Sequence, residues 1–137
     1  MKYLKTFEQL NSDEIVYKIK TNFNLELENE FSKYLQPEFI KIGKENVKVF
    51  LFKPDFGVRI TSVFNRQPYT LYANICVVFI EDGKWKRSGY TKFYKSIPLQ
   101  EKKSRENFVK NYVSGLEPKY QSRMKRILNK NIKKYNI

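Results

Sequence analysis

The stretch YTLYANICVVFIE, Tyr69–Glu81, is apolar on both faces of an extended chain. Successive side chains of a strand point to opposite sides of the sheet. One face would carry Leu71, Ala73, Ile75, Val77 and Phe79, and the other Tyr72, Cys76, Val78 and Ile80. A strand of this kind belongs at the centre of a sheet that is covered on both sides or strongly curled. We therefore expect Tyr69–Glu81 to be a central strand.

The residues around this strand predict an antiparallel meander. The section Phe39–Lys95 is rich in β-branched and aromatic side chains, which favour strands. Residues typical of turns interrupt it at Gly43-Lys44-Glu45-Asn46, Pro54-Asp55-Phe56-Gly57, Asn65-Arg66-Gln67-Pro68 and Asp82-Gly83. Strands joined by short turns pair with their neighbours in the chain, so we expect four or five antiparallel strands.

Helices are predicted before the sheet. Asn11-Ser12-Asp13-Glu14 has the pattern of a capping box, which indicates a helix over Ser12–Asn22 with Ile15, Ile19 and Phe23 on its buried stripe. A second helix over Leu25–Gln36 would end before Pro37 and bury Leu27, Phe31, Tyr34 and Leu35. Tyr3–Leu10 could add a short helix in front of these two.

Two helices are also predicted after the sheet. The first covers Pro98–Ser114, with Phe108, Tyr112 and Val113 turned inward. Gly115 ends it, and a final helix starts near Pro118. The apolar stripe of that helix is Tyr120, Met124, Ile127, Leu128, Ile132 and Tyr135. The fold class is therefore α+β, as a single domain over residues 1–137, with a helical section at 1–37, an antiparallel sheet at 38–95 and a basic helical section at 98–137.

Positive charge is concentrated at one end of the chain. The net charge is +13, yet residues 1–83 hold eleven basic and eleven acidic residues, whereas residues 84–137 hold sixteen basic and three acidic ones. A genome-wide bias toward lysine codons would also raise the positive charge of the first 83 residues. Such a bias therefore does not explain the asymmetry. Such an asymmetry is typical of proteins whose partner is a polyanion, with nucleic acid the leading candidate.

Several functional classes are excluded by missing residues. The chain has no histidine and one cysteine, Cys76, so histidine-based triads, cysteine-rich zinc sites and internal disulfides are closed to it. It also lacks the glycine-rich phosphate loops of common nucleotide-binding proteins, and we expect no cofactor. Cys76 in an apolar run and the absence of a signal peptide or membrane-spanning stretch favour the reducing cytoplasm.

Five residues resemble the signature of a nuclease family. Pro54-Asp55 followed by Asp82-Gly83-Lys84 is similar to the Pro-Asp and Asp-x-Lys pattern of the restriction-endonuclease-like superfamily, which implies a metal-dependent nuclease. In that family the second acid and the lysine project side by side from a strand. Asp82-Gly83 is instead the preferred pair of a two-residue hairpin turn, which would place the acid at a loop tip. We expect no catalytic residues, and a nuclease is the third hypothesis.

The candidate binding residues come from two basic segments. Residues Lys84–Lys95 hold five cations and four aromatic rings in twelve positions, a combination that can hold phosphates and stack bases. The final helix adds cations beside its apolar stripe. The candidate set is Lys84, Trp85, Lys86, Arg87, Tyr90, Lys92, Tyr94, Lys95, Arg123, Lys125, Arg126, Lys130, Lys133 and Lys134.

The leading hypothesis is a non-catalytic nucleic-acid-binding protein. Single strands or RNA are slightly favoured, because aromatic rings suit unstacked bases and no segment resembles a groove-reading helix. Lysine, which outnumbers arginine, contacts phosphate as a point charge and does not read base edges. The main alternative is a small interaction or inhibitor protein, of the kind that viruses and mobile elements encode, which binds an acidic protein or a nucleoprotein enzyme. A purely structural role for the same residues, as an edge strand with blocking lysines, is equally compatible with the pattern.

Overall fold

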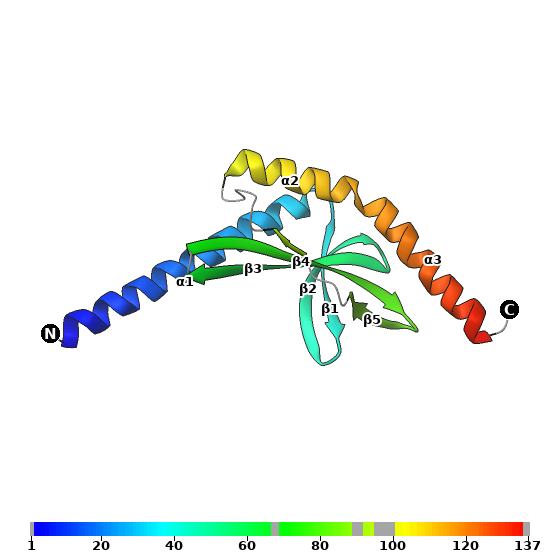
Figure 1. The fold of residues 1–137 in the computed structure, drawn as a ribbon, viewed down its shortest axis with the longest axis horizontal. Helices are drawn as coiled ribbons and strands as arrows, with labels where there is room; N and C mark the ends of the chain where they lie inside the picture. Colours follow the sequence, from blue (N-terminus) through cyan, green and yellow to red (C-terminus); the bar gives the residue numbers. More distant parts are fainter. Residues whose placement is uncertain (1, 67–68, 89–91, 95–100, 136–137) are drawn as a thin grey trace.

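The molecule is a curled sheet with helices at both ends of the chain (Figure 1). This computed structural model describes residues 2–66, 69–88, 92–94 and 101–135. The helices are α1 (Lys2–Ser32), α2 (Lys102–Ser114) and α3 (Leu116–Tyr135). The strands are β1 (Gln36–Ile42), β2 (Glu45–Lys53), β3 (Phe56–Arg66), β4 (Tyr69–Glu81), β5 (Lys84–Arg87) and β6 (Lys92–Tyr94). The predicted α+β class is confirmed.

The sheet is an antiparallel meander from β1 to β5, with β4 between β3 and β5. The short β6 also pairs with β4, beyond the end of β5. Predicted turns lie at residues 43–44, 54–55 and 82–83, while the fourth, at 67–68, falls outside the described residues. Asp82 and Gly83 have φ of 54° and 72°, the left-handed backbone that a tight hairpin requires. The sheet curls into a half-barrel, which brings β1 near β5.

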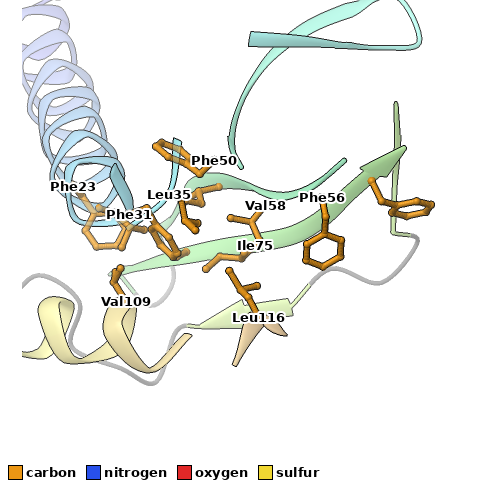
Figure 2. Close-up of a cluster of buried hydrophobic side chains, with 13 residues drawn as sticks. Phe23, Phe31, Leu35, Phe50, Phe56, Val58, Ile75, Val109 and Leu116 are labelled. Atoms are coloured by element: carbon orange, nitrogen blue, oxygen red, sulfur yellow. The ribbon is translucent and has the colours of Figure 1, made fainter. Parts of the chain in front are cut away.

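Two apolar clusters lie on opposite faces of the sheet. The larger one joins Phe23, Leu27 and Phe31 of α1 to β2, β3 and β4, and to Val109 of α2 and Leu116 of α3 (Figure 2). The smaller one holds Val47, Val49 and Val78, with Trp85 packed against them. β4 supplies Ala73, Ile75 and Phe79 to the first cluster and Val78 to the second. The predicted central strand, apolar on both faces of a curled sheet, is confirmed.

The N-terminal section is one continuous helix, so the prediction of separate helices over Tyr3–Leu10, Ser12–Asn22 and Leu25–Gln36 is wrong. The first 36 residues contain neither proline nor glycine, and the capping residues at 11–14 are tolerated inside a helix that nothing interrupts. The helix also ends earlier than predicted, at Ser32. Gln36 already begins β1, because Leu35 turns into the core and Pro37 cannot continue a helix.

The burial of α1 changes along its length. Phe23, Leu27 and Phe31, spaced by four residues, are buried on the sheet, whereas Ile15 and Ile19 are 56% and 45% exposed. Tyr34, predicted to be buried, is also exposed. Figure 1 shows that the first half of α1 extends past the edge of the sheet, which accounts for the exposure of Ile15 and Ile19.

The two C-terminal helices follow the prediction at their junction. Gly115 separates α2 from α3, which starts two residues before Pro118. The helix predicted from Pro98 begins later, at Lys102, and residues 95–100 lie outside the described part. Phe108, Tyr112, Val113, Tyr120 and Ile127 pack against the larger cluster, as predicted. Leu128, Ile132 and Tyr135, predicted to be on the buried stripe, are exposed, although Lys130 of the same segment contacts Glu81 of β4.

None of the helices, searched over the described residues, combines the length and apolar character that a membrane crossing requires.

Candidate nucleic-acid interface

β5 separates the predicted basic and aromatic segment into two faces. Its register places Lys86 opposite Phe79 and Trp85 opposite Ile80 of β4. Directly paired residues of an antiparallel sheet share a face. Lys86 therefore lies on the face that the helices cover, and the Trp85 ring packs, half-buried, against the smaller cluster on the other face. This packing gives Trp85 a structural role.

A basic flank runs along α3. Its members, Lys119, Arg123, Arg126, Lys130 and Lys133, are spaced by four, three, four and three residues, so they line one side of the helix. Two contacts show which way this side faces. The Arg123 guanidinium lies 4.2 Å from the centre of the Phe79 ring, and Lys130 Nζ lies 3.0 Å from Glu81 Oε1. The basic flank is therefore turned toward the hairpin of β4 and β5.

A cleft of about 330 Å³ lies between this flank and the sheet. Its helix wall is formed by Pro118, Lys119, Ser122, Arg123 and Arg126, and its sheet wall by Phe56, Val77 and Ser88. We call this hollow, with the basic flank and Lys86, the basic cleft. The helix wall supplies three cations and one hydroxyl, while the floor is apolar. Such a surface can hold phosphate oxygens at its rim and a flat or sugar-like group on its floor.

Glu81 is the carboxylate that faces the basic cleft from β4. It accepts hydrogen bonds from Lys130 Nζ at 3.0 Å and from Lys86 Nζ at 3.3 Å. These two bonds, the one from Lys130 foremost, lower the pKa of Glu81 below its ordinary value. Lys86 also lies 3.8 Å from Asp82. Two cations thus share Glu81 and fix the end of α3 to the β4–β5 hairpin.

Arg123 and Arg126 carry the charge at the centre of the cleft. Arg123 is half-buried with its guanidinium over Phe79, whereas Arg126 is exposed. Partial burial lowers the pKa of Arg123, and the nearby positive charge of Arg126 lowers it further, against the opposite effect of Glu81. The crowding of these two like charges is relieved when an anion binds between them.

Three acidic residues of α1 pair with cations outside α3. Glu26 binds Arg105 of α2 at 3.1 Å, Glu28 lies 3.6 Å from Lys48, and Glu30 lies 2.8 Å from Lys33. None of these cations belongs to α3. Among the described residues, Lys130 of the basic flank pairs with Glu81, whereas Arg126 and Lys133 are exposed and form no ion pair, so their charge is left for a partner.

The structure distributes the other predicted site residues over several surfaces. Arg87 lies on the Trp85 face of β5, and Lys125 points away from the basic flank on α3. Lys84 is exposed next to the hairpin turn, and Lys134 lies exposed beside Tyr135. By register, Lys92 and Tyr94 lie opposite Ile75 and Ala73 of β4. Tyr90 and Lys95 fall outside the described residues.

Of the eight residues that line the cleft, only Arg123 and Arg126 were in the predicted set, and the three missed polar ones are Ser88, Lys119 and Ser122. The alternating spacing of four and three residues that starts at Lys119 was readable in the sequence, and it groups the five cations on one side of the helix. The sequence does not reveal which side of α3 faces β5. That depends on the packing of Leu116 and Tyr120 on the core.

The two acids of the nuclease-like pattern have other surroundings. Asp82 sits in the hairpin turn, as predicted, with Lys86 as its nearest cation. Asp55 interacts with Tyr120, whose pKa is raised by burial first and by the Asp55 charge second. Over the described part of the chain, no cluster of three aspartate, glutamate or cysteine side chains suitable for a metal ion occurs.

No protein-family model, no curated protein and no solved structure matches this chain.

Proposed function

We propose that the protein binds nucleic acid non-catalytically, through phosphate contacts in the basic cleft. The observation that carries this proposal is the basic flank of α3: five cations on one side of a helix, turned toward Lys86, with Glu81 as the carboxylate between them. A surface of this kind neutralises several phosphates at once and releases their counterions. Lysine and arginine in this arrangement fix the backbone of the nucleic acid and do not read its sequence.

A single strand suits the cleft better than a duplex. The hollow of about 330 Å³ admits a short piece of a single strand, with a base or sugar against the partly exposed Val77. A duplex is too wide to enter and would contact only the exposed rim of α3. Binding without base-edge contacts implies little sequence preference and a strong dependence on salt.

Fluorescence polarisation tests this proposal directly. Labelled single-stranded RNA, single-stranded DNA and duplex DNA are titrated with the protein at two salt concentrations. We expect micromolar or tighter binding of the single strands at low salt, and a steep loss at the higher concentration. Failure of all three probes to bind at low salt would rule the proposal out, and tighter binding of the duplex would overturn the single-strand preference.

Paired charge reversals test whether the cleft is the site. Arg126→Glu with Lys133→Glu changes two exposed cations of the basic flank. Lys103→Glu with Lys125→Glu makes the same change of net charge at two exposed cations elsewhere. The first pair should weaken binding at least about tenfold more than the second and lower the salt slope by roughly 0.7 per lost contact. Equal effects of both pairs would show that net charge, and not the cleft, governs binding.

A further inference from the structure

Two arginines converge on the face of the sheet opposite the basic cleft. Arg59 of β3 pairs with Cys76 of β4, and Arg87 of β5 pairs with Val78 of β4. Cys76 and Val78 are two residues apart and therefore share a face. Arg59 and Arg87 thus flank β4 from both sides and stand on the same surface.

The turn between β1 and β2 closes this surface into a hollow. Because the sheet curls, β1 approaches β5, and the turn residues Ile42, Gly43, Lys44 and Glu45 meet the two arginines. The hollow has a volume of about 400 Å³. Residues far apart in sequence therefore build one site at the open end of the half-barrel, separate from the basic cleft.

The positive charges of this hollow are not compensated inside the protein. Within the described residues, neither Arg59 nor Arg87 forms an ion pair, and Lys44 adds a third cation at the rim. Glu45 is the carboxylate of the lining, and it is exposed and lies beyond ion-pair distance of either guanidinium. An anion in the hollow would face two guanidinium groups that no carboxylate of the described residues neutralises.

We propose that this hollow, lined by Arg59, Arg87 and Lys44, binds a phosphate monoester dianion. Guanidinium groups present rigid pairs of N–H donors that match two phosphate oxygens at once, and a dianion uses both arginines. The volume leaves room for a small group attached to the phosphate. A nucleoside 5′-monophosphate is a ligand of this class, and inorganic phosphate, which presents the same dianion without the ester group, serves as the simpler probe. This site does not depend on nucleic-acid binding in the basic cleft.

Nuclear magnetic resonance of the arginine side chains tests the proposal. Inorganic phosphate is titrated into the full-length protein at constant ionic strength, and the Nε–Hε signals of Arg59 and Arg87 are followed. A parallel titration uses a nucleoside 5′-monophosphate. We expect saturable shifts of both signals, with tighter binding of the nucleotide if the attached group contacts the hollow. Absence of saturation with both ligands, or the same shifts on adding chloride, would overturn the proposal.

Three variants separate this site from the cleft. Arg87→Lys keeps the charge and loses the paired donors, so phosphate should bind about tenfold more weakly. Glu45→Gln removes the carboxylate at the rim and should tighten binding. Arg126→Glu with Lys133→Glu should leave phosphate binding unchanged, since both residues lie on the other face. Unchanged affinity in Arg87→Lys, or loss of affinity in the α3 variant, would contradict the assignment whatever the result with oligonucleotides.

Discussion

The two long helices, α1 and α3, have the same relation to the sheet and opposite charge. In each, one half packs on the core and the other half projects beyond it at one end of the molecule (Figure 1). Both projecting halves expose apolar side chains, such as Ile15 and Ile19 in α1 and Leu128 and Ile132 in α3. Yet α1 contains four basic and six acidic residues, whereas α3 contains seven basic residues and one acidic residue.

This difference shows which property sets α3 apart. Exposed apolar residues occur on both projecting ends and do not distinguish them. Three of the six acidic residues of α1, Glu26, Glu28 and Glu30, are paired with Arg105, Lys48 and Lys33. Lys130 of the basic flank pairs with Glu81 of the neighbouring strand, whereas Arg126 and Lys133 form no ion pair with any described residue. The excess charge of the basic flank, ordered along one side of the helix, is what favours a polyanionic partner.

A substitution in the packed half of α1 should cause the largest loss in the free energy of unfolding. Phe31 is fully buried and contacts Phe50 and Tyr112, so Phe31→Ala leaves a cavity where helix, sheet and α2 meet. We expect a loss of about 3–5 kcal/mol in the free energy of unfolding. Urea denaturation followed by circular dichroism measures it. A loss below about 1 kcal/mol would show that the core tolerates the cavity and that α1 contributes little to it.

A second substitution tests the close approach of β3 to β2 at Gly57. The Gly57 backbone lies so close to β2 that an added Cβ would stand 2.5 Å from the Phe50 carbonyl oxygen. Gly57→Ala should therefore cost about 1–3 kcal/mol, since the two strands must separate. Gly83→Ala is not a suitable control, because Gly83 has positive φ. Gly115→Ala, where the nearest atom would be 3.5 Å away, should cost less in the same denaturation assay.

Glu81, which binds α3 to the β4–β5 hairpin through Lys130, should make a smaller contribution to stability, and this contribution should depend on pH. Because Lys130 and Lys86 lower the pKa of Glu81, the carboxylate adds stability at pH values above its ordinary pKa of 4.5, and this contribution is lost as the pH falls through the lowered value. Glu81→Gln should thus be less stable than the wild type at neutral pH, and the difference should vanish in acid. Melting temperatures between pH 7 and pH 2.5 measure this, and a difference that is constant with pH would contradict it.

Glu81→Gln also tests whether charge near α3 affects nucleic-acid binding more than charge on α1. Glu81→Gln removes the carboxylate that the basic flank meets, so single-stranded RNA should bind more tightly than to the wild type. Glu28→Gln, which changes the charge by the same amount on α1, should leave the affinity nearly unchanged. A decrease in affinity in Glu81→Gln would mean that the ion pairs are needed to orient α3.

Substitutions in the projecting half of α1 should change the free energy of unfolding least. Ile15→Ala and Ile19→Ala remove exposed side chains that contact nothing in the larger cluster. Each should change the free energy of unfolding by no more than about 0.5 kcal/mol. Urea denaturation over a range of protein concentrations measures the effect. A larger loss that grows with protein concentration would show that these residues pack against a second molecule.

The sequence predicted those features that depend on local pattern. The bounds of β4, its two apolar faces and three hairpin turns follow from alternation and turn residues, and so does the division of β5 between Lys86 and Trp85. The continuity of α1 was missed, because a capping box marks a helix start only where the preceding residues leave the helix. The exposure of Ile15 depends on how far α1 extends past the sheet, and that of Leu128 on which side of α3 is turned to the sheet, and no local pattern encodes either.

The candidate sites were predictable to different degrees. The cations of α3 could be identified from composition, but their orientation toward β5 depends on tertiary packing. Arg59 was not predicted as a site residue, because no other charged residue or motif lies near it in its strand. Its meeting with Arg87 depends on the antiparallel order of three strands and on the curl of the sheet.

The alternation along β5 also limits how the chain can vary. The two-residue turn at Asp82 and Gly83 sets which side chains of the next strand point inward. A single residue inserted there would shift the pairing by one position, so that Lys86 would enter the apolar cluster and Trp85 would face solvent beside α3. An insertion of one residue at this turn would therefore damage folding and rearrange the basic cleft together, whereas an insertion of two residues would preserve the phase of the strand.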